Sequence, residues 1–274
     1  MNIKSKELRV AIKAARKAGA YVRKQQGKVI VEKTKSNWKD LLTKNDIESE
    51  KIILETLQSI FPEDTFITEE AHAAESPSKR TWVIDPIDGT TNYVSGLPFY
   101  AISIALITDN GPHVGVVYAP LLKKMYTAER GKGAFCNNKR ITLRKTQHLN
   151  EAVIAFGFNY FKDAKLKAWI EKYAPLINAV RDARRFGSAA LDCCLVAEGT
   201  LSAYVEPALK PWDIAAGKLI IEETGAKLTD EEGNPVEMFR RVEGKYECKP
   251  IIASTGEPIH AEIQAILAKE KITS

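Results

Sequence analysis

A short apolar strand that runs directly into a carboxylate-bearing turn constrains this chain more than any other feature. Residues Thr81-Trp82-Val83-Ile84 are β-branched or aromatic, and Asp85-Pro86-Ile87-Asp88-Gly89-Thr90-Thr91-Asn92 follows at once. On a straight strand, Asp85 and Asp88 would point to opposite faces, about 10 Å apart. The proline fixes its own φ and the glycine tolerates backbone angles closed to other residues. We therefore predict that the segment turns sharply where the strand ends, so that both carboxylates converge.

Two converging carboxylates need a compensating charge. At a separation of ~4 Å they would repel by about 1 kcal/mol in water and about 4 kcal/mol near a protein surface, so a cation or a bound proton is expected. The donors are all oxygen, which favours Mg²⁺, Mn²⁺ or Ca²⁺ over zinc or copper, and the EF-hand spacing is absent. Backbone N–H groups of residues 89–92 could cradle a phosphate. The alternative is an ordinary loop, because Asp-Pro and Asp-Gly pairs are common in turns.

The rest of the chain alternates between helical and extended patterns and has no low-complexity linker. Helices are predicted over residues 5–25, 45–60, from about 164, 188–197 and 211–224. Strands are predicted over residues 65–68, 81–84, 101–107, 114–118, 125–128, 152–156 and 201–205. This order indicates layered helices and sheets in one unit, residues 1–274, with an N-terminal lobe of about 1–150 and a C-terminal lobe of about 151–274.

Composition excludes several classes of protein. The longest apolar stretches, such as residues 101–107, are far shorter than the ~20 residues of a membrane helix, and the N-terminus lacks the apolar core of a secretion signal. The four cysteines fit neither a zinc nor a disulfide pattern, which indicates reduced, mostly buried thiols. The net charge of +5 comes from scattered basic pairs, so no nucleic-acid partner is expected. A cytoplasmic protein without membrane contact is predicted.

Two motifs resemble one known family. Residues Trp82 to Asn92 are similar to the signature of inositol monophosphatases, and Leu209-Lys210-Pro211-Trp212-Asp213-Ile214-Ala215-Ala216-Gly217 is similar to the family's C-terminal motif. The resemblance extends from about Lys35 to Ala253. It implies an α+β fold, a layered αβαβα sandwich of the inositol monophosphatase or sugar phosphatase type.

The same resemblance implies a magnesium site of two or more ions, for which Mn²⁺ could substitute. The ligands carried over are Glu69, Asp85, the backbone carbonyl of Ile87, Asp88 and Asp213. Lys35 resembles a lysine near a loop that completes a metal site. Taken singly, Glu69 could be a solvated loop acid and Asp213 an acid favoured by a helix N-terminus.

The resemblance also implies how phosphate is hydrolysed. Family enzymes attack phosphorus in line with a metal-activated water, and a Thr-Asp pair similar to Thr90 and Asp46 orients and deprotonates it, with Glu69 as a further catalytic acid. Asp46 ends the run Asp40-Leu41-Leu42-Thr43-Lys44-Asn45-Asp46, and its alternative role is a helix cap.

Substrate contacts are carried over in the same way. Asp88, Gly89 and Thr90 would meet the phosphate, and Gly187-Ser188-Ala189 and Glu206 would meet hydroxyls of the alcohol. Ser188 replaces a threonine of the family and could equally cap a helix. Two departures, Thr68 for glycine and Tyr93 for phenylalanine, touch no ligand.

The leading hypothesis is Mg²⁺-dependent, lithium-sensitive hydrolysis of myo-inositol monophosphate by a homodimer. A related phosphatase acting on fructose 1,6-bisphosphate, NADP or 3′-phosphoadenosine 5′-phosphate is the alternative, although Thr91-Asn92 resembles the inositol branch. A non-catalytic metal- or partner-binding role is the second alternative.

Overall fold

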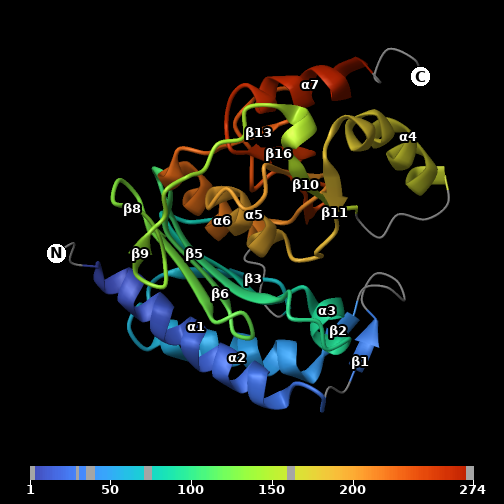
Figure 1. Ribbon diagram of the computed structural model, residues 1–274. Helices are drawn as coiled ribbons and strands as arrows, with labels where there is room; N and C mark the ends of the chain where they lie inside the picture. Colours follow the sequence, from blue (N-terminus) through green and yellow to red (C-terminus); the bar gives the residue numbers. More distant parts are fainter. Residues whose placement is uncertain (1–3, 29–30, 35–40, 71–75, 159–163, 270–274) are drawn as a thin grey trace.

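Five alternating layers of helix and sheet make up the chain (Figure 1). The computed structural model describes residues 4–28, 31–34, 41–70, 76–158 and 164–269. Two helices cover a large sheet, two further helices separate it from a smaller sheet, and two more cover the smaller sheet's far face. The predicted αβαβα sandwich is therefore confirmed.

The first layer consists of α1 (Lys6–Gln25) and α2 (Lys44–Gln58). The Ser5 side chain caps α1 by accepting a hydrogen bond from the Leu8 N–H at 3.1 Å, and Thr43 caps α2. The buried positions of α1 recur at helical spacing and pack on one face of the large sheet, together with α2. Both helices begin and end close to the predicted residues because caps and periodicity agree.

The large sheet has the strand order β3-β4-β5-β6-β7-β8-β9, in which only β3 and β4 are parallel. Its strands are β3 (Thr65–Thr68), β4 (Arg80–Asp88), β5 (Ala101–Thr108), β6 (Gly111–Ala119), β7 (Lys124–Glu129), β8 (Gly133–Cys136) and β9 (Lys139–Arg140). The meander of β5, β6 and β7 was predicted. The short strands β8 and β9 were not.

Strand β4 corrects one prediction, because it does not end before Asp85. It runs on to Asp88, and its register against β5 shifts between Asp85 and Asp88. An irregularity of this kind bends a strand and redirects its side chains. The sharp turn comes one residue later, at Gly89 with φ +93°, where the short helix α3 (Thr90–Val94) begins.

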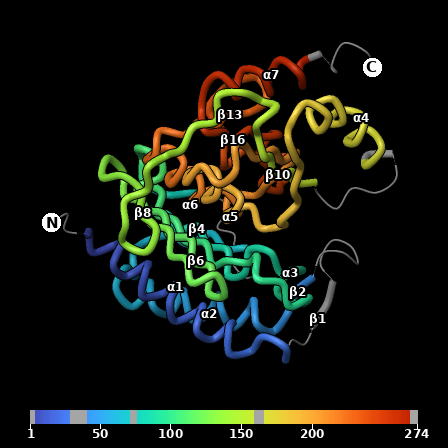
Figure 2. Tube along the Cα trace, in the orientation of Figure 1, coloured from blue at the N-terminus to red at the C-terminus, as the bar shows by residue number. Residues whose placement is uncertain are grey.

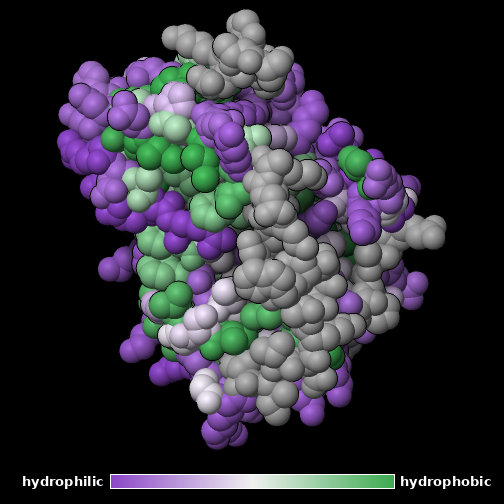
Figure 3. Space-filling model, turned by 90° about the vertical axis from the view of Figure 1, so that its right-hand side faces the viewer, coloured by the Kyte–Doolittle hydropathy of each residue, from purple (hydrophilic) through white to green (hydrophobic). Residues whose placement is uncertain are grey.

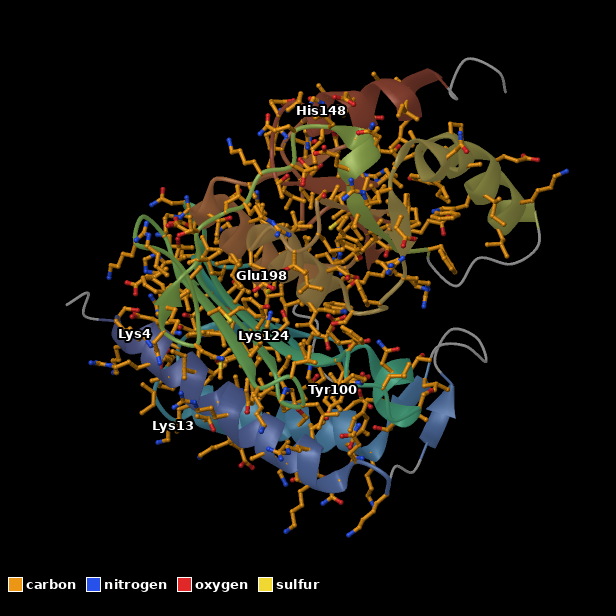
Figure 4. All side chains as sticks on the ribbon, in the orientation of Figure 1. Lys4, Lys13, Tyr100, Lys124, His148 and Glu198 are labelled. Atoms are coloured by element: carbon orange, nitrogen blue, oxygen red, sulfur yellow. The ribbon has the colours of Figure 1, made fainter. Side chains whose placement is uncertain are left out.

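The middle layer consists of α5 (Ala189–Ala197) and α6 (Pro211–Thr224), which lie between the two sheets (Figure 2). Every residue of α5 is buried, as expected for a helix covered on both sides. Gly115 lets α6 approach the large sheet, because a Cβ there would lie 2.9 Å from the Ala216 carbonyl oxygen. A salt bridge of 2.7 Å joins Lys124 to Glu198 across the same boundary (Figure 4).

The smaller sheet has the order β11-β10-β12-β16-β13. Its strands are β10 (Val153–Phe156), β11 (Asp182–Arg184), β12 (Ala203–Glu206), β13 (Lys227–Asp230) and β16 (Ile251–Ser254). Helices α4 (Ala164–Ala179) and α7 (Ile259–Lys269) cover it. Two small antiparallel sheets pair β1 (Val31–Thr34) with β2 (Leu41–Thr43) and β14 (Arg241–Val242) with β15 (Lys245–Tyr246), and a 3-10 turn spans Leu149–Glu151.

The state of the cysteines and the polarity of the surface can be compared with what the composition predicted. Three cysteines are buried, Cys136 is half-buried, and all four are free thiols. On the face shown in Figure 3, hydrophilic side chains predominate and hydrophobic ones form separate patches. None of the helices in the described residues is long and apolar enough to cross a bilayer.

A buried histidine in the first turn of α7, facing β13 and β16, should make stability depend on pH. His260 lies 2.8 Å from the Ser254 hydroxyl and 3.0 Å from that of Thr229, and burial lowers its pKa to about 4, with Lys227 lowering it further and Glu257 opposing. In the unfolded chain the imidazole binds a proton below pH ~6.5, whereas in the folded chain it stays neutral until pH ~4. The free energy of unfolding therefore falls as the pH drops through that window. Urea unfolding at pH 7.5, 6 and 5 should show a smaller loss for His260→Gln than for the wild type. Equal losses would contradict the assignment.

Candidate functional site

The residues that follow the straight part of β4 form one wall of the site. Asp85 and Asp88 are both buried, and the Asp85 carboxylate accepts a hydrogen bond of 3.0 Å from the Ile87 N–H. The Pro86 carbonyl accepts a hydrogen bond of 2.9 Å from the Ser49 hydroxyl on α2. The bend in β4 is thus stabilised by the Asp85 side chain within the strand and by Ser49 on α2.

Asp88 connects this wall to the middle layer. One carboxylate oxygen accepts hydrogen bonds from the Ser188 hydroxyl at 2.5 Å and the Ala190 N–H at 2.8 Å, and the other accepts one from the Ala189 N–H at 3.2 Å. Ser188 stands at the N-cap position of α5, as its alternative interpretation predicted, but its side chain makes no capping bond and donates to Asp88. The Asp88 carboxylate instead accepts from the first N–H groups of the helix. Burial, and also the charge of Glu69, raises its pKa to about 6.

A third acid reaches the site from α6. Asp213 lies in the helix's first turn, where its carboxylate accepts a hydrogen bond of 2.7 Å from the Lys210 N–H. Burial and then the charges of Glu69 and Asp88 raise the pKa of Asp213 well above its usual range. Glu69 directly follows β3, and its N–H donates to the Ile84 carbonyl at 3.2 Å. Acids from three separate elements therefore act on one another electrostatically.

These acids match the donor chemistry of a hard divalent cation. All are oxygen donors, and their mutual charge together with their burial disfavours full ionisation without a compensating cation. Within the residues that the structure describes, no group of three or more His, Cys, Asp and Glu side chains already stands ready to hold a metal ion. The fit to magnesium therefore rests on donor type and electrostatics.

A hydroxyl and a carboxylate are paired beside this wall. The Thr90 hydroxyl lies 3.1 Å from Asp46 Oδ1 and 3.1 Å from the Ile87 carbonyl oxygen, so it can donate its proton to either. The second Asp46 oxygen accepts hydrogen bonds from the Thr43 N–H, at 2.9 Å, and from the Thr43 hydroxyl. Asp46 thus takes part in the capping box of α2 and also reaches Thr90. Asp40 and Lys35 lie outside the described residues.

The predicted hydroxyl-binding residues lie at the ends of α5 and β12. Glu206 ends β12, and its Oε2 accepts a hydrogen bond of 2.9 Å from the Tyr204 hydroxyl. Burial raises the pKa of Glu206 to about 8, although Arg185 opposes this. Gly187 stands next to Gly89, since a Cβ on Gly89 would lie 3.1 Å from the Gly187 carbonyl oxygen. The phosphate-cradle segment and the Gly187-Ser188-Ala189 segment are therefore neighbours.

Three residues that the sequence did not single out also belong here. The Asn92 amide donates at 2.6 Å to the carbonyls of Phe99 and Phe186, which ties the two halves of the site together. Asp192 on α5 is buried, and its Oδ1 has no hydrogen-bond partner within the described part of the chain. Gly157 lies against Glu206. Asn92 stood inside the recognised motif, but Asp192 and Gly157 carry no local signal.

Comparison with known proteins identifies the family. The sequence profile of the inositol monophosphatase family matches residues 4–271. This chain belongs to that family.

Relatives within the inositol monophosphatase family include proteins with different names. Nus factor SuhB of Vibrio cholerae is 40% identical over 228 residues, which cover 82% of this chain and 85% of the relative. The IMPase of Thermotoga maritima is 32% identical and covers 98% of this chain and 99% of its own, with a TM-score of 0.86. An IMPase/NADP phosphatase complexed with Mg²⁺ and phosphate is 28% identical and covers 94% of each chain, with a TM-score of 0.80. Family and fold together support a phosphatase, and the magnesium complex suggests dependence on that ion.

Proposed function

We propose that this chain is a Mg²⁺-dependent phosphomonoesterase that hydrolyses a myo-inositol monophosphate to inositol and phosphate. The observation that carries the proposal is the contact of Thr90 with Asp46 beside the electrostatically linked acids Asp88, Asp213 and Glu69. A hydroxyl and carboxylate pair can orient and deprotonate water, and the neighbouring acids fit a cation that binds phosphate.

Each residue has a defined role in the proposal. Glu69, Asp85, Asp88, Asp213 and the Ile87 carbonyl would hold magnesium, and Lys35 would support a metal site. Bound magnesium would supply the positive charge that stabilises phosphate oxygens and the leaving group. Thr90 would orient the attacking water and Asp46, with Glu69, would accept its proton. The backbone of residues 89–92 would position the phosphate.

The alcohol part of the substrate would be recognised by residues beside Asp88 at the ends of α5 and β12. Ser188, Ala189 and Glu206 stand beside Asp88, and they offer a hydroxyl, backbone amides and a carboxyl group to a polyol. The name of the related IMPase/NADP phosphatase keeps NADP among the alternative substrates, with fructose 1,6-bisphosphate and 3′-phosphoadenosine 5′-phosphate. A homodimer is part of the proposal, and light scattering should give twice the chain mass of 30.4 kDa.

A panel of phosphate esters tests whether inositol monophosphate is the preferred substrate. Phosphate release from inositol 1-phosphate, fructose 1,6-bisphosphate, NADP and 3′-phosphoadenosine 5′-phosphate should be measured with magnesium at equal enzyme concentration. We expect kcat/KM for inositol 1-phosphate to exceed the others by about 10-fold or more, because a site built to bind hydroxyls discriminates against substrates that leave them unpaired. A higher value for any other member would replace inositol phosphate as the substrate.

A second candidate is an assembly role that does not require catalysis. It is favoured by the name of the 40% identical relative, Nus factor SuhB. If the panel shows no turnover, this candidate replaces the enzyme proposal. The two roles are compatible if turnover is found.

A further inference from the structure

A glycine makes room for the carboxyl group that ends β12. Gly157 directly follows β10, and its N–H donates to the Val205 carbonyl at 2.8 Å. A Cβ at this position would lie 1.2 Å from Glu206 Oε2 and 2.1 Å from Cδ. The φ of Gly157 is not positive, so the role of glycine here is to leave space and not to adopt a special backbone conformation. Any larger residue would occupy the place where the carboxyl group lies.

A tyrosine fixes the same oxygen. The Tyr204 hydroxyl donates to Glu206 Oε2, and both side chains are buried. Oε1 accepts no hydrogen bond from the residues that the structure describes. The carboxyl group therefore has one oxygen held by the protein and one left for a ligand.

The surroundings explain why this group needs support. The charge of Asp88 acts on both Asp192 and Glu206, and the buried Asp192 Oδ1 has no hydrogen-bond partner among the residues that the structure describes. Arg185 is the cation that acts on both Glu206 and Asp192. An acid in this position tends to move toward water unless contacts hold it. Gly157 and Tyr204 provide the space and the hydrogen bond that keep it in place.

We propose that Gly157 and Tyr204 are positioning residues that fix Glu206 as a hydroxyl acceptor and so give the site selectivity for phosphomonoesters of polyols. This inference rests on the proposed function, because Glu206 is assigned to the alcohol there. Neither residue needs to touch the substrate. Because the displaced group in Gly157→Ala is the end of a flexible side chain, the variant should fold and move Glu206 away.

The test compares a substrate with alcohol hydroxyls to one without them. The ratio of kcat/KM for inositol 1-phosphate to that for p-nitrophenyl phosphate should be measured for wild type, Gly157→Ala, Glu206→Ala and the double variant. The loss of one hydrogen bond to a carboxyl group corresponds to a fall of about 10- to 100-fold in this ratio. Gly157→Ala and Glu206→Ala should fall alike, and the double variant should fall no further, since both act through one group.

Two additional measurements test the positioning of Glu206 independently of Gly157→Ala and of turnover. Tyr204→Phe removes only the hydroxyl and should lower the ratio by about 2- to 10-fold, so it tests the same idea if Gly157→Ala fails to fold. Calorimetric dissociation constants for the two substrates, measured in an Asp46→Asn background in which turnover is slowed, should show a matching fall in the ratio of affinities when Gly157→Ala or Glu206→Ala is added. Wild-type selectivity in both Gly157→Ala and Tyr204→Phe, or additive losses in the double variant, would overturn the inference. Absence of turnover in the wild type would instead contradict the proposed function, and the binding ratio would still decide the positioning role.

Discussion

Replacing Asp88 by asparagine is expected to lower magnesium-dependent phosphate release by about 10³-fold or more, in the range lost when one preorganised electrostatic contact is removed from a catalytic site. Asparagine keeps an oxygen that can accept from Ser188 or Ala190, so α5 should still be capped. The change removes a buried negative charge beside Glu69, so the melting temperature should stay the same or rise. Steady-state kinetics and thermal unfolding of the same preparation measure both effects.

Asp230→Asn is the matched control for this variant. Asp230 is also buried, but its carboxylate accepts from the Asn234 N–H at 2.7 Å on the far sheet, outside the candidate site. Its pKa is lowered by hydrogen bonds from Asn234 and Lys249 although burial opposes them, so neutralising it should reduce stability and spare activity. An Asp88→Asn protein that keeps more than about a tenth of wild-type activity would contradict the role given to this acid.

Removing the acceptor of the Thr90 and Asp46 pair should have the second-largest effect. General base catalysis contributes about 10²- to 10⁴-fold, so Asp46→Asn should lower kcat by that factor and change KM by less than about 3-fold. Thr90→Ala should lower kcat similarly, and Thr90→Ser, which keeps the hydroxyl 3.1 Å from Asp46, should keep most of it.

The double variant distinguishes a catalytic pair from two independent residues. If Thr90 and Asp46 act together, the loss in Asp46→Asn/Thr90→Ala should be close to that of either single variant. Multiplied losses, or unchanged kcat in Asp46→Asn, would show that the pair does not handle the water. If kcat is unchanged in Asp46→Asn, Asp46 is only a cap of α2, the alternative that its capping box with Thr43 supports.

The helices of the fold were predictable where local signals agreed. Helices α1 and α2 have capping side chains and regular apolar spacing, and α6 ends at Gly225, whose φ is +77°. Strands β13 and β16 were missed although β3, β10 and β12, which have the same length, were predicted. Their pairing joins distant parts of the chain. In the sheet, β16 lies between β12 and β13, an order that no local pattern encodes.

In the candidate site, too, the features set by local sequence were predicted and those set by packing were not. The run from Asp85 to Asn92 indicated acids, a turn and a phosphate cradle, because proline, glycine and aspartate act locally. The hydrogen bond from Ser188 to Asp88 joins residues 100 positions apart, and the space that Gly157 leaves for Glu206 appears only once β10 and β12 pair. Such contacts depend on packing between elements and cannot be derived from spacing.

The most direct test of the central claim is phosphate release from inositol 1-phosphate as a function of magnesium concentration. Wild-type protein stripped with a chelator should release no phosphate, and added Mg²⁺ should restore a saturable rate that Asp88→Asn lacks. Release that is independent of magnesium, or no release at any magnesium concentration, would contradict the account.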